Sequence, residues 1–292
     1  SGSGKSTLGN CINGLIPFSY PGEIQGSLTV CGIETKSSSL FALSQHVGTV
    51  LQDPDGQFIG LSVGEDIAFA LENECMSQRE MKDVVKKTAE MVNMDSLLNA
   101  SPFELSGGQK QRVSFAGVMV HDVEALLFDE PLANLDPATG KTAIELIDQI
   151  YQDYNKTVVI IEHRLEDVLH RKIDRVIVMS DGRIVADLSP DALMAADILK
   201  TLGIREPLYV TALKYAGVPV TEALRAGRID TLDVDAVRGA ICDWDAAQPE
   251  LEKKPANAPI LEASALSYRY VEQRPILKNL NFSIEAGEMV SL

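Results

Sequence analysis

The residues that could do chemistry begin at the first position of the chain. Ser1, Gly2, Ser3, Gly4, Lys5, Ser6 and Thr7 match the end of G-x-x-x-x-G-K-[ST], the pattern of a phosphate-binding loop that lacks only its opening Gly and the next residue here. In such a loop successive backbone N–H groups point at phosphate oxygens, the lysine reaches the β- and γ-phosphates, and the next hydroxyl ligates Mg²⁺. We therefore expect all seven residues to bind nucleotide phosphates, with Ser6 as a Mg²⁺ ligand.

A pair of carboxylates follows an apolar run much further along the chain. Residues 125–128 are apolar and directly precede Asp129 and Glu130. A continuous apolar run is typical of a strand buried on both faces of a parallel sheet, and ligands bind at the carboxyl ends of such strands. We expect Asp129 to hold Mg²⁺ through water and Glu130 to polarise an attacking water. Together with Lys5 and Ser6, the pair predicts a nucleotide-hydrolysis site.

A short glycine-containing motif precedes these carboxylates: Leu105, Ser106, Gly107, Gly108 and Gln109. Ser106 and Gln109 have the spacing of a capping box, which predicts a helix running to about Val120. The two glycines allow another molecule to approach the helix end closely. The pentapeptide resembles the signature motif of the ABC-type ATPases. The resemblance implies that this helix end faces the γ-phosphate bound to a different nucleotide-binding domain.

Three further positions resemble ABC motifs in the order expected of that family. Gln52 resembles the Q-loop glutamine that contacts Mg²⁺ and the water, and His163 resembles the H-loop histidine that contacts the γ-phosphate. Asp136 resembles the D-loop aspartate and, followed by Pro137, is also a predicted helix N-cap. The resemblance implies ATP and Mg²⁺ as cofactors. The expected catalytic residues are Glu130, His163 and Gln52, and the expected Mg²⁺ ligands are Ser6, Gln52 and Asp129. The remaining histidines, His46, His121 and His170, match no motif and are interpreted as structural or surface residues.

The end of the chain resembles the beginning of another domain of the same kind. Residues 260–270 and 275–285 have the pattern of strands that precede a phosphate loop, and Met289–Val290 is predicted as a further strand. In the family an aromatic near Tyr270 stacks on adenine. Tyr268 is the alternative, and a packed surface aromatic is the other interpretation. We therefore expect the chain to be a fragment of a tandem protein with two ABC domains, running from within one phosphate loop to just before the second.

The implied fold is α/β, a P-loop NTPase of the ABC type. It has a mixed core sheet, a small antiparallel β-subdomain and a helical signature subdomain. We expect residues 1–200 to be the first ABC domain without its N-terminal strands, 201–258 to be C-terminal helices and a linker, and 259–292 to be the truncated start of the second. Residues 8, 12 and 15 are expected on one face of the first helix. Strands are expected at 26–32, 47–51, 125–128, 157–161 and 175–179 (all but the first in the core), a hairpin turn at 181–182, and helices within 52–120, 208–215 and 221–226.

Composition limits the classes of function. The net charge of −16 argues against a bulk electrostatic interaction with nucleic acid, so no nucleic-acid partner is expected. Four cysteines show no metal-ligand spacing, which in a protein of this kind implies reduced thiols. No apolar stretch approaches the ~20 residues that cross a bilayer. A transport role therefore requires separate membrane subunits.

Several local strings resemble the ATPases of energy-coupling factor (ECF) importers, which take up vitamins and transition-metal ions. They are residues 52–58, 101–112, 115–117 and 162–167. The resemblance implies two membrane partners, a transmembrane coupling subunit and a small substrate-binding subunit, and a peripheral place on the cytoplasmic face of the cell membrane. Two alternatives stay open: a conventional ABC transporter ATPase, and a soluble tandem ABC ATPase that acts on ribosomes or nucleic acid. The competence of the second ATP site and the cargo are not encoded in this sequence.

Overall fold

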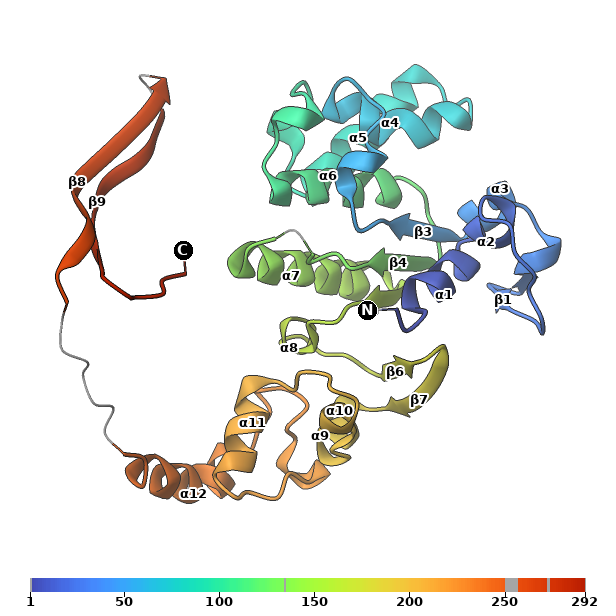
Figure 1. The fold of residues 1–292 in the computed structure, drawn as a ribbon. Coiled ribbons are helices and arrows are strands. Elements are labelled where there is room, and N and C mark those ends of the chain that lie inside the picture. The colour runs from blue at the N-terminus through green and yellow to red at the C-terminus, as the bar shows by residue number, and fades with distance from the viewer. Residues whose placement is uncertain (1, 134, 250–256, 272–273, 292) are drawn as a thin grey trace. The chain divides into compact units, whose positions relative to one another are not determined.

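The computed structural model describes residues 2–133, 135–249, 257–271 and 274–291, and it is drawn in Figure 1. Ser1, one of the predicted phosphate-binding residues, lies outside them. The chain divides into two compact units, residues 1–244 and 245–292. No helix among the described residues has the length and apolar character needed to cross a bilayer.

A parallel three-stranded sheet forms the centre of the first unit. Its strands are β3 (Val47–Val50), β4 (Ala125–Asp129) and β5 (Thr157–Ile161), in the order β3-β4-β5. Leu126, Leu127 and Phe128 of the middle strand are 1–2 % exposed, so the prediction of a strand buried on both faces is confirmed. Because the three strands are parallel, the residues that follow them lie together at the carboxyl end of the sheet.

Helices cover both faces of this sheet. Leu127 packs in a cluster with Ile12 of α1 (Lys5–Ile12), whereas Leu126 and Phe128 belong to the cluster that contains the buried face of α7 (Pro137–Tyr154). The predicted face of residues 8, 12 and 15 on one helix is wrong. Leu8 is 38 % exposed, because the helix approaches β5 through Gly9, where a Cβ would lie 3.0 Å from Ile161 Cδ1. The helix ends at Ile12, so Leu15 lies in the next helix, which follows Gly14 at a φ of 81°.

The segment predicted as largely helical contains three helices that pack on one another. They are α4 (Val63–Asn73), α5 (Gln78–Met91) and α6 (Gly107–Met119), and they begin after the serine N-caps Ser62, Ser77 and Ser106. Short 3₁₀ turns, Pro54–Gln57, Asp95–Leu97 and Pro102–Glu104, lie between these helices or before them. This group is the helical subdomain that the sequence predicted.

Two antiparallel hairpins and small helices complete the first unit. Strands β1 (Thr29–Val30) and β2 (Ile33–Glu34) form one pair, and β6 (Val176–Ser180) and β7 (Arg183–Leu188) form the other. Asp181 and Gly182 have φ of 47° and 71°, as a tight hairpin turn requires, so that prediction is confirmed. The placing of residues 175–179 in the core sheet is wrong, because β6 pairs with β7 in a separate two-stranded sheet.

Small helices form the remainder of the unit. They are α2 (Leu15–Phe18), α3 (Leu40–Ser44), α8 (Leu165–Val168), α9 (Pro190–Ala195), α10 (Ile198–Thr201), α11 (Leu208–Tyr215) and α12 (Val234–Ala246), which runs across the boundary between the units. The predicted helix at 208–215 is confirmed, whereas 221–226 contains only a 3₁₀ turn at Glu222–Leu224. The predicted strand at 26–32 shrinks to residues 29–30, and its last two residues form the turn to β2.

The second unit is an antiparallel hairpin of β8 (Pro259–Val271) and β9 (Arg274–Glu285). Its register shifts several times, and Tyr268 and Tyr270 are in edge-to-face contact at 5.1 Å between ring centroids. The predicted strand at Met289–Val290 is wrong: the residues after Glu285 form a turn and then irregular backbone, with Met289 almost fully exposed. A β-strand there would need a neighbour to pair with.

Candidate functional site

The phosphate-loop residues lie at the start of α1. Gly2 and Gly4 have φ of 80° and 89°, the left-handed region that glycine adopts without a steric penalty. Gly4 is the N-cap of the helix, so the first backbone N–H groups of α1 point out of its N-terminus. The β6–β7 turn supports the loop, because the Gly182 N–H donates to the Ser3 carbonyl at 3.2 Å. Lys5 Nζ donates to Ser3 Oγ at 3.2 Å, which places its charge beside the loop.

Ser6 and Asp129 come together from positions far apart in the sequence. Ser6 Oγ donates to Asp129 Oδ1 at 3.2 Å. Burial is the main cause that raises the pKa of Asp129, and Glu130 and Glu162 raise it further, whereas the Ser6 bond and Lys5 oppose the rise. Hydroxyl and carboxylate oxygens are the donors that Mg²⁺ prefers in proteins. The Ser6 hydroxyl would ligate Mg²⁺ while still donating to Asp129, and Asp129 would hold the ion through a bound water.

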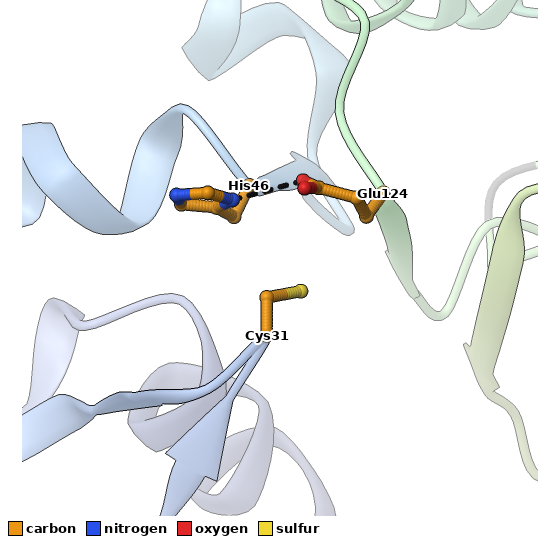
Figure 2. Close-up of side chains that lie close together, drawn as sticks. All are labelled: Cys31, His46 and Glu124. Atoms are coloured by element: carbon orange, nitrogen blue, oxygen red, sulfur yellow. Dashed lines mark hydrogen bonds and ion pairs between the residues drawn. The ribbon is translucent and has the colours of Figure 1, made fainter.

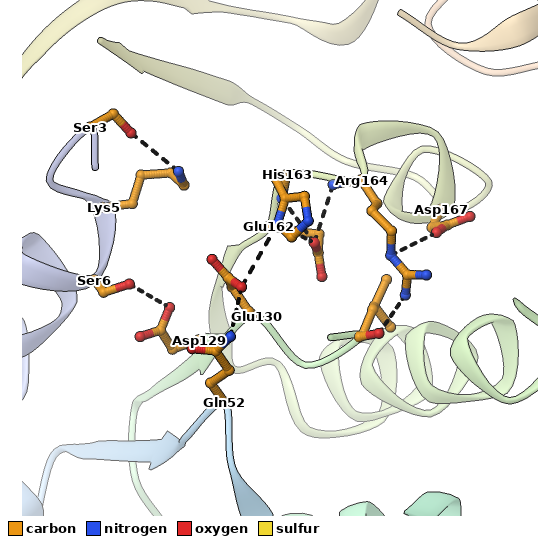
Figure 3. A network of polar contacts seen from close by, with 11 residues as sticks. Ser3, Lys5, Ser6, Gln52, Asp129, Glu130, Glu162, His163, Arg164 and Asp167 are labelled. Carbon is orange, nitrogen blue, oxygen red and sulfur yellow. Dashed lines mark hydrogen bonds and ion pairs between the residues drawn. The ribbon is translucent and has the colours of Figure 1, made fainter. Parts of the chain in front are cut away.

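Side chains that follow all three core strands converge on the Glu130 carboxylate, as Figure 3 shows. Gln52, two residues after β3, donates through Nε2 to Glu130 Oε2 at 3.0 Å. His163, two residues after β5, has its Nδ1 3.8 Å from the same oxygen. Glu130 itself has φ of 49°, which turns the chain out of the line of β4 directly after Asp129. The structure therefore brings together the predicted catalytic residues, next to the Ser6–Asp129 pair.

Glu162 is a component of the site to which the sequence interpretation gave no role. Its side chain is 3 % exposed, and its Oε1 accepts hydrogen bonds from the backbone N–H groups of His163 at 2.8 Å and Arg164 at 3.1 Å. The same oxygen lies 3.3 Å from His163 Nδ1. Arg164 in turn donates to the Leu132 carbonyl at 2.5 Å and pairs with Asp167 at 3.2 Å. Glu162 is thus a positioning residue for His163, and its place directly before that histidine was the available sequence signal.

The signature motif and Asp136 form a second group, on α6 and α7. Ser106 caps α6 through a complete capping box with Gln109, and Asp136 caps α7 by accepting from the N–H groups of Ala138 and Thr139 at 3.0 and 3.1 Å. Hydrogen bonds from the hydroxyl and backbone N–H of Thr139 lower the pKa of Asp136. The two helix starts are close, because a Cβ on Gly108 would lie 2.6 Å from Thr139 Cγ2. The capping partners of Ser106 and Asp136 lie in their own helices, so these contacts do not join the group to Lys5 or Asp129.

The other histidines take part in surface contacts, in agreement with their interpretation. His46 contacts Glu124 at 2.9 Å, and His121 lies 3.5 Å from Glu74. His170 Nδ1 is 2.6 Å from the Asp167 carbonyl. Tyr270, predicted to stack on adenine, belongs to the second unit and is 79 % exposed. Its role stays a prediction.

Comparisons with protein families and known proteins agree with this arrangement. A family described as ABC transporter matches residues 1–133, and a family described as ATP-binding cassette cobalt transporter matches residues 196–268. Two bacterial relatives, both named provisionally as ABC transporter ATP-binding proteins, match the whole chain. One, from Photobacterium profundum, is 55 % identical with 52 % of its own length covered, and one from Clostridium perfringens is 52 % identical with 51 % covered. The chain spans about half the length of these relatives.

Solved structures show the same fold. The structure of cbiO1 from Clostridium perfringens, described as part of the ABC transporter complex cbiONQ, is 28 % identical with a TM-score of 0.62, covering 73 % of this chain and 84 % of that one. The ATP-binding cassette MJ0796 was solved as a dimer in a post-hydrolysis state with ADP and phosphate. It is 26 % identical with a TM-score of 0.55, and the match covers 64 % of this chain and 81 % of that one.

Proposed function

Because the chain belongs to the ABC transporter family and carries its ATP-binding domain, we propose that it hydrolyses ATP to drive import of a vitamin or a metal ion through separate membrane subunits. The observation that carries the proposal is the convergence of the phosphate loop, the Ser6–Asp129 pair and the Gln52–Glu130–His163 group at one edge of the parallel sheet. That edge is where ligands bind in sheets of this kind.

Each group has a definite part in hydrolysis. The N–H groups at the start of α1, together with Lys5, hold the β- and γ-phosphates and offset their charge. Bound Mg²⁺, held by Ser6, Asp129 and Gln52, would neutralise charge that develops on the phosphate oxygens. Glu130 accepts a hydrogen bond from the attacking water and orients it in line with the bond to the leaving group. His163, whose Nδ1 lies 3.3 Å from Glu162 Oε1, donates a hydrogen bond to the γ-phosphate.

The resemblance of Ser106–Gln109 to the ABC signature motif supports composite ATP sites, each shared between two ABC domains. In this account Lys5, Asp129 and Glu130 act with the signature motif of another domain, and Ser106–Gln109 act on the ATP of that domain. We propose that residues 1–200 form one ABC domain, 201–258 its C-terminal helices and linker, and 259–292 the start of the second. The isolated chain is then expected to have little ATPase activity.

The proposed partners are a transmembrane coupling subunit and a small membrane protein that binds the cargo, so the ATPase would lie on the cytoplasmic face of the membrane. Two similarities support this choice and favour a transition-metal cargo: the cobalt-transporter family that matches residues 196–268, and cbiO1, which is part of the cbiONQ complex. The resemblance of residues 52–58 and 101–112 to ECF ATPases points the same way.

Purification of the full-length protein from detergent-solubilised membranes, followed by mass spectrometry of what accompanies it, tests the proposal. A multi-span coupling protein together with a small membrane protein is the expected result. A Lys5→Ala variant is the control for ATP hydrolysis: it removes the charge beside the phosphate loop, so phosphate release should fall while the same membrane proteins accompany it. Co-purification of ribosomal or nucleic-acid-bound proteins with no membrane partner would exclude import and leave a soluble ATPase.

A further inference from the structure

A cysteine, a histidine and a glutamate lie together away from the ATP site. The ligand atoms of Cys31, His46 and Glu124 are all within 4.8 Å of one another, and Figure 2 shows the three side chains converging from separate segments. Cys31 comes from the turn between β1 and β2, His46 lies between α3 and β3, and Glu124 directly precedes β4. The proposed ATP hydrolysis uses none of them.

Two of the three positions are fixed by the backbone. The His46 carbonyl accepts hydrogen bonds from the N–H groups of Glu124 at 3.1 Å and Ala125 at 3.0 Å. The side chains meet as well, with His46 Nδ1 2.9 Å from Glu124 Oε2. Because the imidazole and the carboxylate are already adjacent, an ion bound between them requires little rearrangement of the core sheet.

The third ligand is presented by a tight turn. Cys31 and Gly32 have φ of 49° and 81° and connect the paired residues Val30 and Ile33, which is the geometry of a two-residue hairpin loop. Asn, Asp or Gly are the usual residues at such positions, so the turn carries an unusual residue with a useful donor atom. Cys31 is exposed and free, so a solvated ion can reach its sulfur. A two-strand hairpin of this size is also the part of the cluster that can move most readily.

We propose that Cys31, His46 and Glu124 bind a divalent transition-metal ion of the Zn²⁺ type, with solvent in the remaining position. A thiolate, an imidazole and a carboxylate are established zinc donors, whereas the sulfur disfavours Mg²⁺ and Ca²⁺. Given the usual zinc bond lengths, neighbouring ligand atoms on a tetrahedral ion lie about 3.3–3.6 Å apart. On such an ion Cys31 Sγ moves roughly 1 Å closer to the other two ligand atoms, whereas His46 Nδ1 and Glu124 Oε2, now 2.9 Å apart, separate slightly.

Charge and protonation fit such an ion. One thiolate and one carboxylate balance the charge of a divalent cation, and because the Cys31 thiol proton leaves as the ion enters, binding adds one positive charge to this part of the protein. The thiol proton passes to solvent, and the bound ion takes the place of the His46–Glu124 hydrogen bond. The ion would link the β1–β2 turn, through Cys31, to the residues that precede β3 and β4 in the core sheet.

Cobalt(II) binding to the full-length protein tests the proposal, because a thiolate bound to Co²⁺ gives an intense charge-transfer band that oxygen ligands do not. The protein is stripped with a chelator, kept reduced with a phosphine, and titrated with Co²⁺ in excess Mg²⁺, which fills the oxygen site at Ser6 and Asp129. The expected result is a saturable thiolate band with tetrahedral visible bands, which Zn²⁺ abolishes by displacing the cobalt.

Variants assign the ligands. Cys31→Ser should lose the band and weaken Zn²⁺ binding by more than the roughly 10–100-fold that loss of an outer-shell partner costs. Glu124→Gln should shift the visible bands. Cys75→Ser is the matched control, since Cys75 is also an exposed cysteine with positive φ, at 58°, and it should leave the titration unchanged. Absence of the thiolate band, its persistence in Cys31→Ser, or its equal loss in Cys75→Ser would overturn the proposal.

Discussion

Replacement of Glu130 by glutamine separates a catalytic role from a structural one. Glutamine keeps the length of the side chain, and its amide oxygen can still accept the hydrogen bond that Gln52 donates at 3.0 Å. The change removes only the negative charge, which is one of the causes that raise the pKa of Asp129. Since Glu130 lies among other carboxylates, folding should not suffer, and we expect the free energy of unfolding to stay within about 1 kcal/mol of the parent.

The expected effect on ATP turnover is much larger. A positioned general base contributes about 10²–10⁴-fold, which corresponds to roughly 2.7–5.4 kcal/mol of activation free energy. Steady-state phosphate release by the full-length protein is the assay, and the rate of a Lys5→Ala variant gives the background from any other site. Binding of ATP should be retained, because Lys5 and the loop are untouched in Glu130→Gln.

Glu162→Gln is the contrasting variant. Glu162 is 3 % exposed and accepts from two backbone N–H groups, so loss of its charge should cost about 1–3 kcal/mol of stability. If Glu130→Gln kept turnover within about threefold of the parent, or lost stability as Glu162→Gln does, the assignment of Glu130 as the base would be wrong.

Three other changes test the geometry of the site. Gly108→Ala puts a methyl group 2.6 Å from Thr139 Cγ2 and should lower the free energy of unfolding, measured in urea, by about 1–3 kcal/mol. In a Thr139→Ser background, which lacks the Cγ2 methyl, most of this loss should disappear. An equal loss in both backgrounds would contradict the contact between α6 and α7. Because the pKa of Asp129 is raised, its contribution to stability is full below the ordinary aspartate pKa and is lost as pH rises through the raised value. In the absence of Mg²⁺, the free energy of unfolding of Asp129→Asn should therefore rise relative to the parent as pH rises from the ordinary aspartate pKa through the raised one. A difference that does not depend on pH would contradict the raised pKa of Asp129. Asp136→Ala should lower the melting temperature, because it removes the N-cap of α7. Since the pKa of Asp136 is lowered, the difference from the parent should shrink as pH falls through that lowered pKa. Asp136→Asn, which can still cap the helix, is the control.

The sequence was most informative where chemistry and periodicity agree. The apolar run before Asp129 and Glu130 predicted a buried central strand, and the family resemblance on Ser106–Gln109 predicted a fold that the structure and the comparisons confirm. The capping spacing of Ser106 and Gln109 also predicted the start of α6 correctly. Such features depend on residues close in sequence, so a pattern can reveal them.

Features that depend on distant contacts were missed. The helical spacing of Leu8 and Ile12 did not show that Gly9 sets the approach of α1 to the sheet, because the approach depends on Ile161. The strand pattern at 175–179 could not say which strand would be its partner. The sequence gives no sign that the Glu162 side chain is buried and lies beside His163, because burial depends on the folded structure.

Backbone hydrogen exchange of the full-length protein, followed by mass spectrometry of the peptides that contain Gly2–Thr7, tests the central claim most directly. The amides of this loop should exchange more slowly with ATP and Mg²⁺ than with adenosine, because only the nucleotide has phosphates for these N–H groups to bind. The Lys5→Ala variant should lose much of that protection. Equal protection by adenosine, or no protection of this loop while ATP binds elsewhere, would contradict the assignment of the phosphate-binding site.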